Sequence, residues 1–126
     1  MKLAYLDTSY LLALGLGEEG SAALVRRLER FDRFMASNLL EAELRAAFAR
    51  EGLTLTGELF DWMKWVFPER PLTPELEQVL SRGYLKGADA WHLACALYAA
   101  EDPRALTFLT LDRRQRAVAR RLGFPT

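Results

Sequence analysis

The chain has 126 residues, of which 51% are hydrophobic and 27% charged, a composition that excludes a disordered or fibrous protein. We expect a single domain over residues 1–126, because a chain of this length buries roughly two-thirds of its unfolded surface. Seventeen basic side chains balance seventeen acidic ones, which argues against nucleic-acid binding by overall charge, so any phosphate-bearing substrate must be held locally.

The cysteine content and the N-terminal sequence bear on the cellular compartment. Cys95 is the only cysteine, so an internal disulfide and a disulfide-framework secreted domain are excluded. The first residues do not form a charged-then-apolar leader, and no uncharged run reaches the roughly 18 residues that a membrane span needs. We therefore expect a cytoplasmic protein with no membrane association.

Short strands alternate with helices along the chain. Apolar runs predict strands at residues 3–6, 33–37 and 105–111, and a weaker edge strand at residues 66–72, which contains two prolines. Alternation of this kind is typical of parallel sheets covered on both faces. The sequence thus predicts an α/β fold with a short central parallel sheet of about four to five strands flanked by helices.

Helix boundaries can be predicted from capping residues. Asp7 precedes a first helix, Thr56 can cap a helix through Phe67, and Thr73 followed by Pro74 opens another. Asp112 with Gln115 can form a capping box that opens the last helix, which Gly123 closes. Apolar stripes at helical spacing predict the remaining helices over residues 24–31, 40–48 and 93–100.

Two aspartates directly follow predicted strands. Asp7 comes after the first strand and Asp112 after the last. The carboxyl ends of parallel strands form the edge at which open α/β sheets bind ligands. Each aspartate could equally serve only as a helix N-cap, so both interpretations stay open at this point.

Two glutamates on the helix over residues 40–48 can be separated by geometry. Helical spacing places Glu43 beside Leu40 in the apolar stripe, whereas Glu41 faces Arg45 one turn on. Glu41 also lies three residues after Asn38, where it can complete a capping box, so we interpret it as structural. A carboxylate that points toward a core needs compensating cations or hydrogen bonds. Glu43 is therefore the stronger functional candidate.

A fourth acid, Asp89, lies on the inward side of its predicted helix, one turn from the start. It could complement the helix dipole, or it could join Asp7, Glu43 and Asp112 in one crevice. Four converging carboxylates repel one another unless they retain protons or are neutralised by divalent cations. Oxygen ligands suit Mg²⁺ or Mn²⁺, and the chain has no cluster of cysteine and histidine for zinc.

Four segments of the chain together resemble the PIN-domain nucleases, and among them the VapC-type toxins of bacterial toxin–antitoxin modules. The segments are Leu-Asp-Thr-Ser at 6–9, Ser-Asn-Leu-Leu-Glu-Ala-Glu-Leu-Arg at 37–45, Ala-Asp-Ala-Trp-His-Leu-Ala at 88–94 and Leu-Thr-Leu-Asp-Arg-Arg at 109–114. The resemblance implies a Mg²⁺- or Mn²⁺-dependent endoribonuclease that leaves a 5′-phosphate and is held in check by a small antitoxin protein. It places the catalytic and metal-binding acids at Asp7, Glu43, Asp89 and Asp112, with supporting hydroxyls at Thr8, Ser9 and Thr110.

Substrate binding requires positive charge beside the acidic residues. Arg113, Arg116 and Arg120 share one face of the helix that follows Asp112, and they are candidates for contacts with RNA phosphates. A solvated helix face is the competing interpretation.

Three further features of the sequence have less specific interpretations. The Gly-x-Gly-x-x-Gly pattern at residues 15–20 is better interpreted as a joint between two helices than as a dinucleotide site, because it does not follow a strand. His92, one turn from Asp89, is interpreted mainly as a packed structural residue, although it could reach a ligand. The aromatic run at residues 59–67, which includes Trp62 and Trp65, fits either the core or an interface with a second copy or an antitoxin.

Two other functions compete with nucleic-acid hydrolysis. In an aspartyl-phosphate phosphatase or receiver, Asp7 would be the nucleophile, but the chain has Ser9 where the phosphatase pattern has a second Asp and lacks the acids and Lys of a receiver. The other alternative is a catalytically weak PIN-fold module that binds RNA or protein. Retention of all four acids disfavours that alternative.

Overall fold

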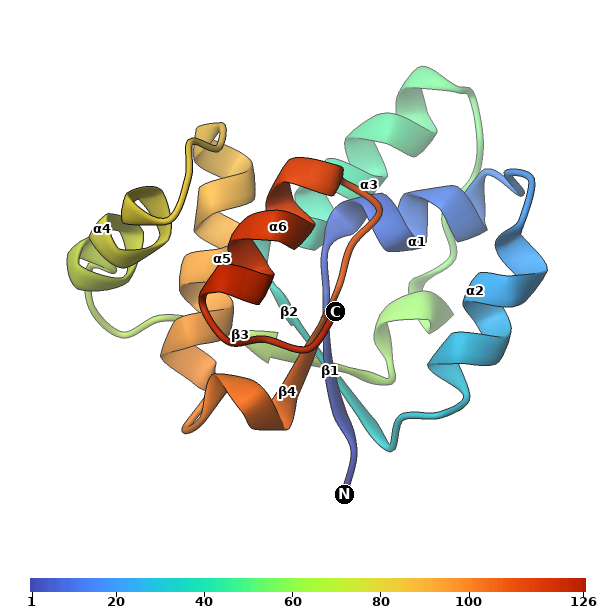
Figure 1. The fold of residues 1–126 in the computed structure, drawn as a ribbon. Coiled ribbons are helices and arrows are strands. Elements are labelled where there is room, and N and C mark those ends of the chain that lie inside the picture. The colour runs from blue at the N-terminus through green and yellow to red at the C-terminus, as the bar shows by residue number, and fades with distance from the viewer.

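The computed structural model describes all residues 1–126 and contains one four-stranded sheet between two groups of helices (Figure 1). Its strands are β1 (Leu3–Leu6), β2 (Arg33–Ser37), β3 (Met63–Val66) and β4 (Leu106–Leu109). All neighbouring pairs are parallel, in the order β3-β2-β1-β4. The predicted α/β architecture, with a short parallel sheet flanked by helices, is confirmed.

Five α-helices and two short 3₁₀ helices lie between the strands, and a sixth α-helix follows β4. They are α1 (Thr8–Gly15), α2 (Ser21–Leu28), α3 (Leu39–Arg50), η1 (Gly57–Phe60), α4 (Thr73–Ser81), α5 (Gly87–Ala99), η2 (Pro103–Ala105) and α6 (Arg113–Arg121). No helix is both long enough and apolar enough to span a membrane.

Alternation along β1 divides the core into two halves. Tyr5 packs with α4, α5 and α6 on one face, where it stacks on Phe108, whereas Ala4 and Leu6 pack with α1 and α3 on the other. Because both faces are covered, the strands consist mainly of apolar residues. Figure 1 shows the two groups of helices on either side of the sheet.

The order in which the chain adds strands to the sheet reverses at β1. β2 and β3 lie on one side of β1, and β4 lies on the other. The backbone N–H of Asp7 donates to the carbonyl of Leu109 at 3.0 Å, which holds the ends of β1 and β4 together. This reversal is a topological switch point, the place where open α/β sheets form a crevice at the carboxyl ends of their strands.

The region from Thr56 to Leu72 differs from the prediction. The helix expected from Thr56 through Phe67 is wrong, because only the 3₁₀ helix η1 forms before the chain enters β3. The strand expected at residues 66–72 begins earlier and ends at Val66, although it does lie at the sheet edge. Met63 and Val66 are buried and Lys64 is exposed, so this part of the aromatic run forms a strand. Pro68 lacks an N–H group and prevents further pairing.

Two predicted caps also differ. Asn38 makes no capping hydrogen bond; Ser37 instead accepts from the N–H of Leu39 at 3.0 Å. Thr73 begins α4 but does not cap it with its side chain. The glycine-rich segment is a joint between helices, as predicted, with α1 ending at Gly15 and Gly20 in the left-handed region at a φ of 85° before α2.

Candidate active site

Polar side chains from separate parts of the chain meet beyond the carboxyl ends of β1 and β4. Asp7 follows β1, and Thr110 follows β4. Glu43 projects from α3, Asp89 from the first turn of α5, and Asp112 caps α6. The fold thus brings the four predicted acids to one edge of the sheet.

Asp7 is a buried carboxylate, only 4% exposed. Its Oδ1 accepts from the side-chain amide of Gln115 at 3.0 Å, and its Oδ2 accepts from the N–H of Ser9 at 3.0 Å. The Ser9 bond is the N-cap of α1, so the capping interpretation of Asp7 is correct without excluding a functional role. Two N–H donors compensate a charge that would be costly to bury alone.

Gln115 is fully buried and connects three parts of the site. Its Oε1 accepts from the hydroxyl of Thr110 at 2.6 Å, while its Nε2 donates to Asp7 and to the carbonyl of Asp89 at 3.2 Å. The predicted capping box is therefore only half correct. Asp112 accepts from the N–H of Gln115 at 2.8 Å, but the Gln115 side chain turns toward Asp7 instead of returning to the cap.

The sequence contains a signal for Gln115 that the prediction missed. Gln115, Val118, Ala119 and Leu122 recur at helical spacing and are all buried. An amide in an apolar stripe needs hydrogen-bond partners inside the protein. That need identifies Gln115 as a residue that faces other polar groups.

Glu43 forms a second cluster with His92 and Thr8. Its Oε1 lies 2.6 Å from His92 Nε2 and accepts from the hydroxyl of Thr8 at 2.7 Å. The hydrogen bond from His92 lowers the pKa of Glu43 against the opposing effect of burial, with a further lowering by the Thr8 hydrogen bond. The geometric preference for Glu43 over Glu41 thus agrees with the structure, in which Glu41 pairs with Arg45 at 2.7 Å on the exposed side.

His92 links the two clusters. The ring is 1% exposed, and Nε2 lies 4.0 Å from Asp7 Oδ1 as well as beside Glu43. Nδ1 is buried without a hydrogen-bond partner, so Nε2 is the nitrogen that orients the ring. The interpretation of His92 as packed is correct for its burial, but it understated the contact with an acid of the site.

Asp89 and Asp112 lie on the open side of the site. Burial raises the pKa of Asp89, and the negative charges of Asp7 and Asp112 raise it further. Asp89 and Asp112 line one hollow of about 100 Å³, together with Lys86 and Arg114. Asp112 is exposed, and one of its oxygens is occupied by the cap of α6.

The donor chemistry of these residues fits a hard divalent cation, although the carboxylates do not already form a chelating cluster. No group of three or more His, Cys, Asp or Glu side chains lies close enough together to hold a metal ion as arranged. Burial is the main cause of the raised pKa of Asp89, and the negative charges of Asp7 and Asp112 add to it. A divalent cation would neutralise that charge through carboxylate oxygens.

The three predicted hydroxyls all lie in the hydrogen-bond network. Thr8 donates to Glu43, and Ser9 Oγ lies 3.2 Å from Thr110 Oγ1. The hydroxyl of Ser9 also accepts from the N–H of Leu111 at 3.1 Å. These hydroxyls therefore position the acids and the strand ends.

The candidate RNA-binding arginines differ in their surroundings. Arg113 is exposed and makes no hydrogen bond or ion pair. Arg116 donates to the carbonyl of Thr110 at 2.9 Å, and Arg120 donates to the hydroxyl of Thr126 at 2.7 Å. Arg114, which the prediction did not include, lines the hollow beside Asp89 and Asp112.

Comparison with known protein families agrees with this arrangement. Residues 4–121 match the model of the PIN domain. The chain therefore belongs to the PIN-domain family, whose members are generally nucleases. A search of curated proteins found no match.

The pKa of Glu43 provides a direct test of the His92 contact. In metal-free protein, carboxyl NMR titration should place this pKa below its ordinary value of 4.5, and His92→Phe should raise it more than Thr8→Val does. Because the pKa is lowered by folding, the associated stability is present above about pH 4.5 and is lost as pH falls through the lowered value. An equal or larger rise in Thr8→Val would contradict the leading role of His92.

Proposed function

We propose that this protein is an endoribonuclease that hydrolyses RNA phosphodiester bonds with Mg²⁺ or Mn²⁺. The observation that carries the proposal is the buried Asp7 carboxylate at the switch point of the sheet, with Glu43 and Asp89 from two other helices near it. A capping role alone would not require Asp7 to be buried or Glu43 and Asp89 to lie near it. Membership in a family of nucleases supports the same reaction class.

Each acid has a distinct role in this proposal. Asp7, Glu43 and Asp89 would hold the main ion, and Asp112 a second ion or a bridging water. When bound, such ions activate water for attack on phosphorus and stabilise the departing oxygen. Gln115 and the N–H of Ser9 fix the Asp7 carboxylate, while His92 and Thr8 orient Glu43.

The side chains around the acids would hold the flanking phosphates. Arg113 is unpaired at the start of α6, and Arg114 lies beside Asp89 and Asp112. Their guanidinium groups can bind phosphate oxygens in a bidentate manner. Arg116 donates to the end of β4, and Arg120 donates to Thr126 near the C-terminus. The remaining N–H groups of both guanidinium groups would be able to bind phosphate.

Two glutamates on α3 form a matched pair for testing this function. Glu43→Gln should lower the rate of RNA cleavage in Mg²⁺ by roughly 100-fold or more, because loss of a residue supporting a ligand already costs about 10–100-fold. Glu41→Gln, two residues away in the exposed pair with Arg45, should leave the rate within about twofold, since exposed pairs contribute less than about 1 kcal/mol. The measurement is single-turnover cleavage of a labelled RNA.

Circular dichroism and thermal melting would show that both variants fold. A Glu43→Gln protein that cleaves RNA at the wild-type rate would exclude the proposed role of the acid. Omission of Mg²⁺ and Mn²⁺, with EDTA present, should abolish cleavage by the wild-type protein.

A second candidate function is a catalytically weak PIN-fold module that binds RNA or protein. The observation that favours it is the internal pairing of the acids: Glu43 is held by His92 and Thr8, Asp112 caps α6, and no chelating cluster is formed. In such a module the carboxylates would serve only as hydrogen-bond acceptors and helix caps.

Metal-dependent thermal stability separates the two candidates. An ion at about 100 times its Kd stabilises the folded state by about 2.7 kcal/mol, so Mg²⁺ or Mn²⁺ should raise the Tm of wild-type protein by several degrees. Asp89→Asn should abolish this rise without lowering the metal-free Tm, because the substitution removes a charge that its neighbours repel. Asp61→Asn, at an exposed site, should retain the full rise. If neither Mg²⁺ nor Mn²⁺ changes the Tm of the wild-type protein, the result would favour the binding module.

We further propose the cellular role of the toxin in a toxin–antitoxin pair, as the VapC-like segments suggest, in the cytoplasm and with a small antitoxin protein as its inhibitor. A homodimer is part of this proposal. An apolar hollow of about 380 Å³ lies between Val25, Phe34 and Trp62, with Trp62 40% exposed and its ring 4.9 Å from that of Phe34. Exposed apolar surface of this kind often marks a protein–protein interface. We propose that a second copy of the chain binds there.

Sedimentation equilibrium tests the dimer. Trp62→Glu should weaken self-association by roughly 30-fold or more, because a charge would replace an aromatic anchor that typically contributes at least 2 kcal/mol. Leu80→Glu introduces the same charge at a residue on α4 that is 47% exposed, and it should leave association unchanged. A wild-type protein that stays monomeric at every concentration would refute the dimer.

A further inference from the structure

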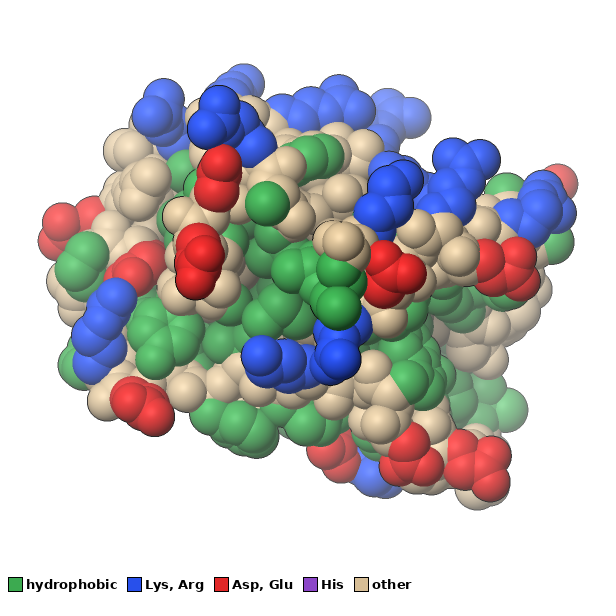
Figure 2. Space-filling model, turned by 90° about the horizontal axis from the view of Figure 1, so that it is seen from below, with side chains coloured by type: hydrophobic (Ala, Val, Ile, Leu, Met, Phe, Trp, Pro, Cys, Tyr) green, Lys and Arg blue, Asp and Glu red, His purple; other side chains and the backbone are tan.

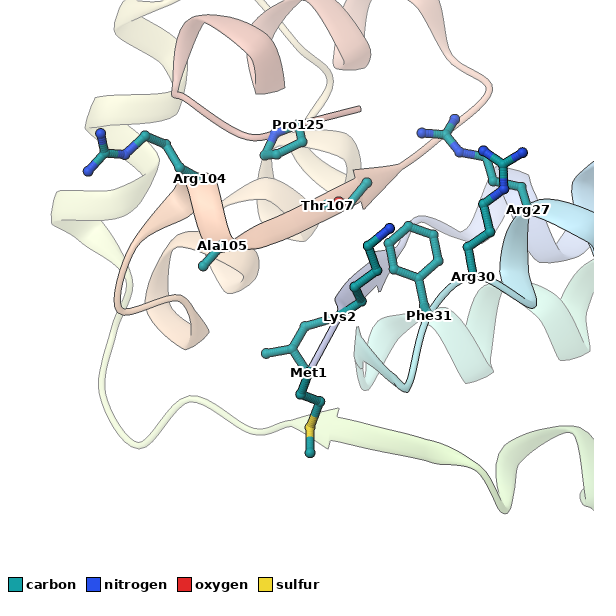
Figure 3. A pocket seen from close by; sticks show the side chains of 10 residues that line it. Met1, Lys2, Arg27, Arg30, Phe31, Arg104, Ala105, Thr107 and Pro125 are labelled. Carbon is teal, nitrogen blue, oxygen red and sulfur yellow. The ribbon is translucent and has the colours of Figure 1, made fainter.

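A basic hollow lies at the end of the sheet opposite the carboxylates. Figure 2 views the molecule from that end, and Lys and Arg side chains gather along one edge of this face. Figure 3 shows the hollow, about 440 Å³ in volume, with Lys2, Arg27 and Arg30 around the ring of Phe31. Arg104 lies at the far side. The hollow is thus built from the start of β1, from α2 and its following loop, and from η2.

The cations of this hollow lack protein partners. The side chains of Lys2, Arg27 and Arg30 make no hydrogen bond or ion pair, whereas Arg104 is held by Asp102 at 3.2 Å. Arg27 lies in the last turn of α2 and Arg30 lies in the turn that follows the helix, three residues on, so their like charges repel. The carboxylate of Asp32 accepts from the backbone N–H of Lys2 at 2.6 Å, so three unpaired cations face one nearby acid and leave a local excess of positive charge in a chain whose charges balance overall.

The chemistry of the hollow fits phosphate groups. Guanidinium groups bind phosphate oxygens through paired N–H donors, and an ammonium adds a point charge. The ring of Phe31 offers a face on which a base can stack, and such stacking is worth about 1–3 kcal/mol in single-strand binding. A volume of about 440 Å³ lies within the range of about 300–1,000 Å³ found for small-ligand sites, which accommodates a nucleotide unit.

The hollow is separate from the carboxylates. Lys2 precedes β1 and Asp7 follows it, so five residues of extended strand, at about 3.3 Å each, set the two ends about 16 Å apart. Because β1 is a central, covered strand, an RNA strand that contacts both ends must pass around the surface of the protein, over a path longer than that distance. We propose that Lys2, Arg27, Arg30 and Phe31 form a second phosphate-binding site that holds the backbone of an RNA strand away from the cleaved bond. This inference rests on the proposed function only for the choice of RNA as the polyanion.

The salt dependence of RNA binding tests the proposal. The variant Arg27→Gln/Arg30→Gln should weaken binding of a single-stranded RNA oligonucleotide. It should also reduce the slope of log K against log salt by about 1.4, since each phosphate contact on a single strand contributes about 0.7. The matched control Arg26→Gln/Arg82→Gln removes two exposed arginines that do not line the hollow, and its slope should equal that of the wild type. Binding is measured by fluorescence anisotropy in EDTA.

Competition by free nucleotides distinguishes the two sources of phosphate. If AMP and ADP do not compete with RNA and only the Arg27/Arg30 variant loses slope, the hollow binds the RNA backbone as proposed. If ADP binds the wild type and not the variant, while the RNA slopes are equal, the site takes free nucleotides and the RNA assignment is overturned. Equal RNA slopes and no nucleotide binding would overturn the site altogether. Because EDTA keeps binding separate from cleavage, an inactive nuclease would leave these outcomes intact.

Discussion

Burial of the Asp7 carboxylate is the constraint on which the rest of the site depends. A charge that is 4% exposed requires donors from within the protein. The amide of Gln115 and the N–H of Ser9 supply them, so α6 and α1 must both dock at the end of β1. Thr110, bonded to Gln115, brings the end of β4 to the same point. The packing of α1, α6 and β4 around the end of β1 therefore also supplies the hydrogen bonds that stabilise the buried Asp7 carboxylate.

The site holds its acids by two different means. Asp7 is fixed by neutral amide donors, whereas Glu43 is held by the ring of His92 and the hydroxyl of Thr8. Asp89 has no side-chain partner of this kind, and its raised pKa reflects burial and the charges of Asp7 and Asp112. The negative charge is therefore satisfied at two acids and left unsatisfied at a third.

Particular residues show what the sequence could predict and what it could not. Periodicity predicted three of the strands and most helices, and helical spacing separated Glu43 from Glu41, because these features follow from local geometry. The prediction for the segment from Thr56 to Leu72 was wrong because its aromatic run suits a helix or an edge strand equally. Pairing with β2, which the local sequence does not encode, makes it a strand. The contacts of Gln115 and His92 depend on elements that are distant along the chain, so their partners could not be predicted from spacing alone.

A net charge of zero over the whole chain is compatible with local groups of like charge at the two ends of the sheet. Carboxylates gather beyond the carboxyl ends of the strands, while Lys2, Arg27 and Arg30 surround the hollow at the amino end. At physiological ionic strength the Debye length is about 8 Å, roughly half the distance of about 16 Å that β1 spans between the two ends. The cations are therefore screened from the carboxylates, and each end interacts with phosphate by its own charge. A polyanion repelled by bare acids at one end can still be attracted at the other.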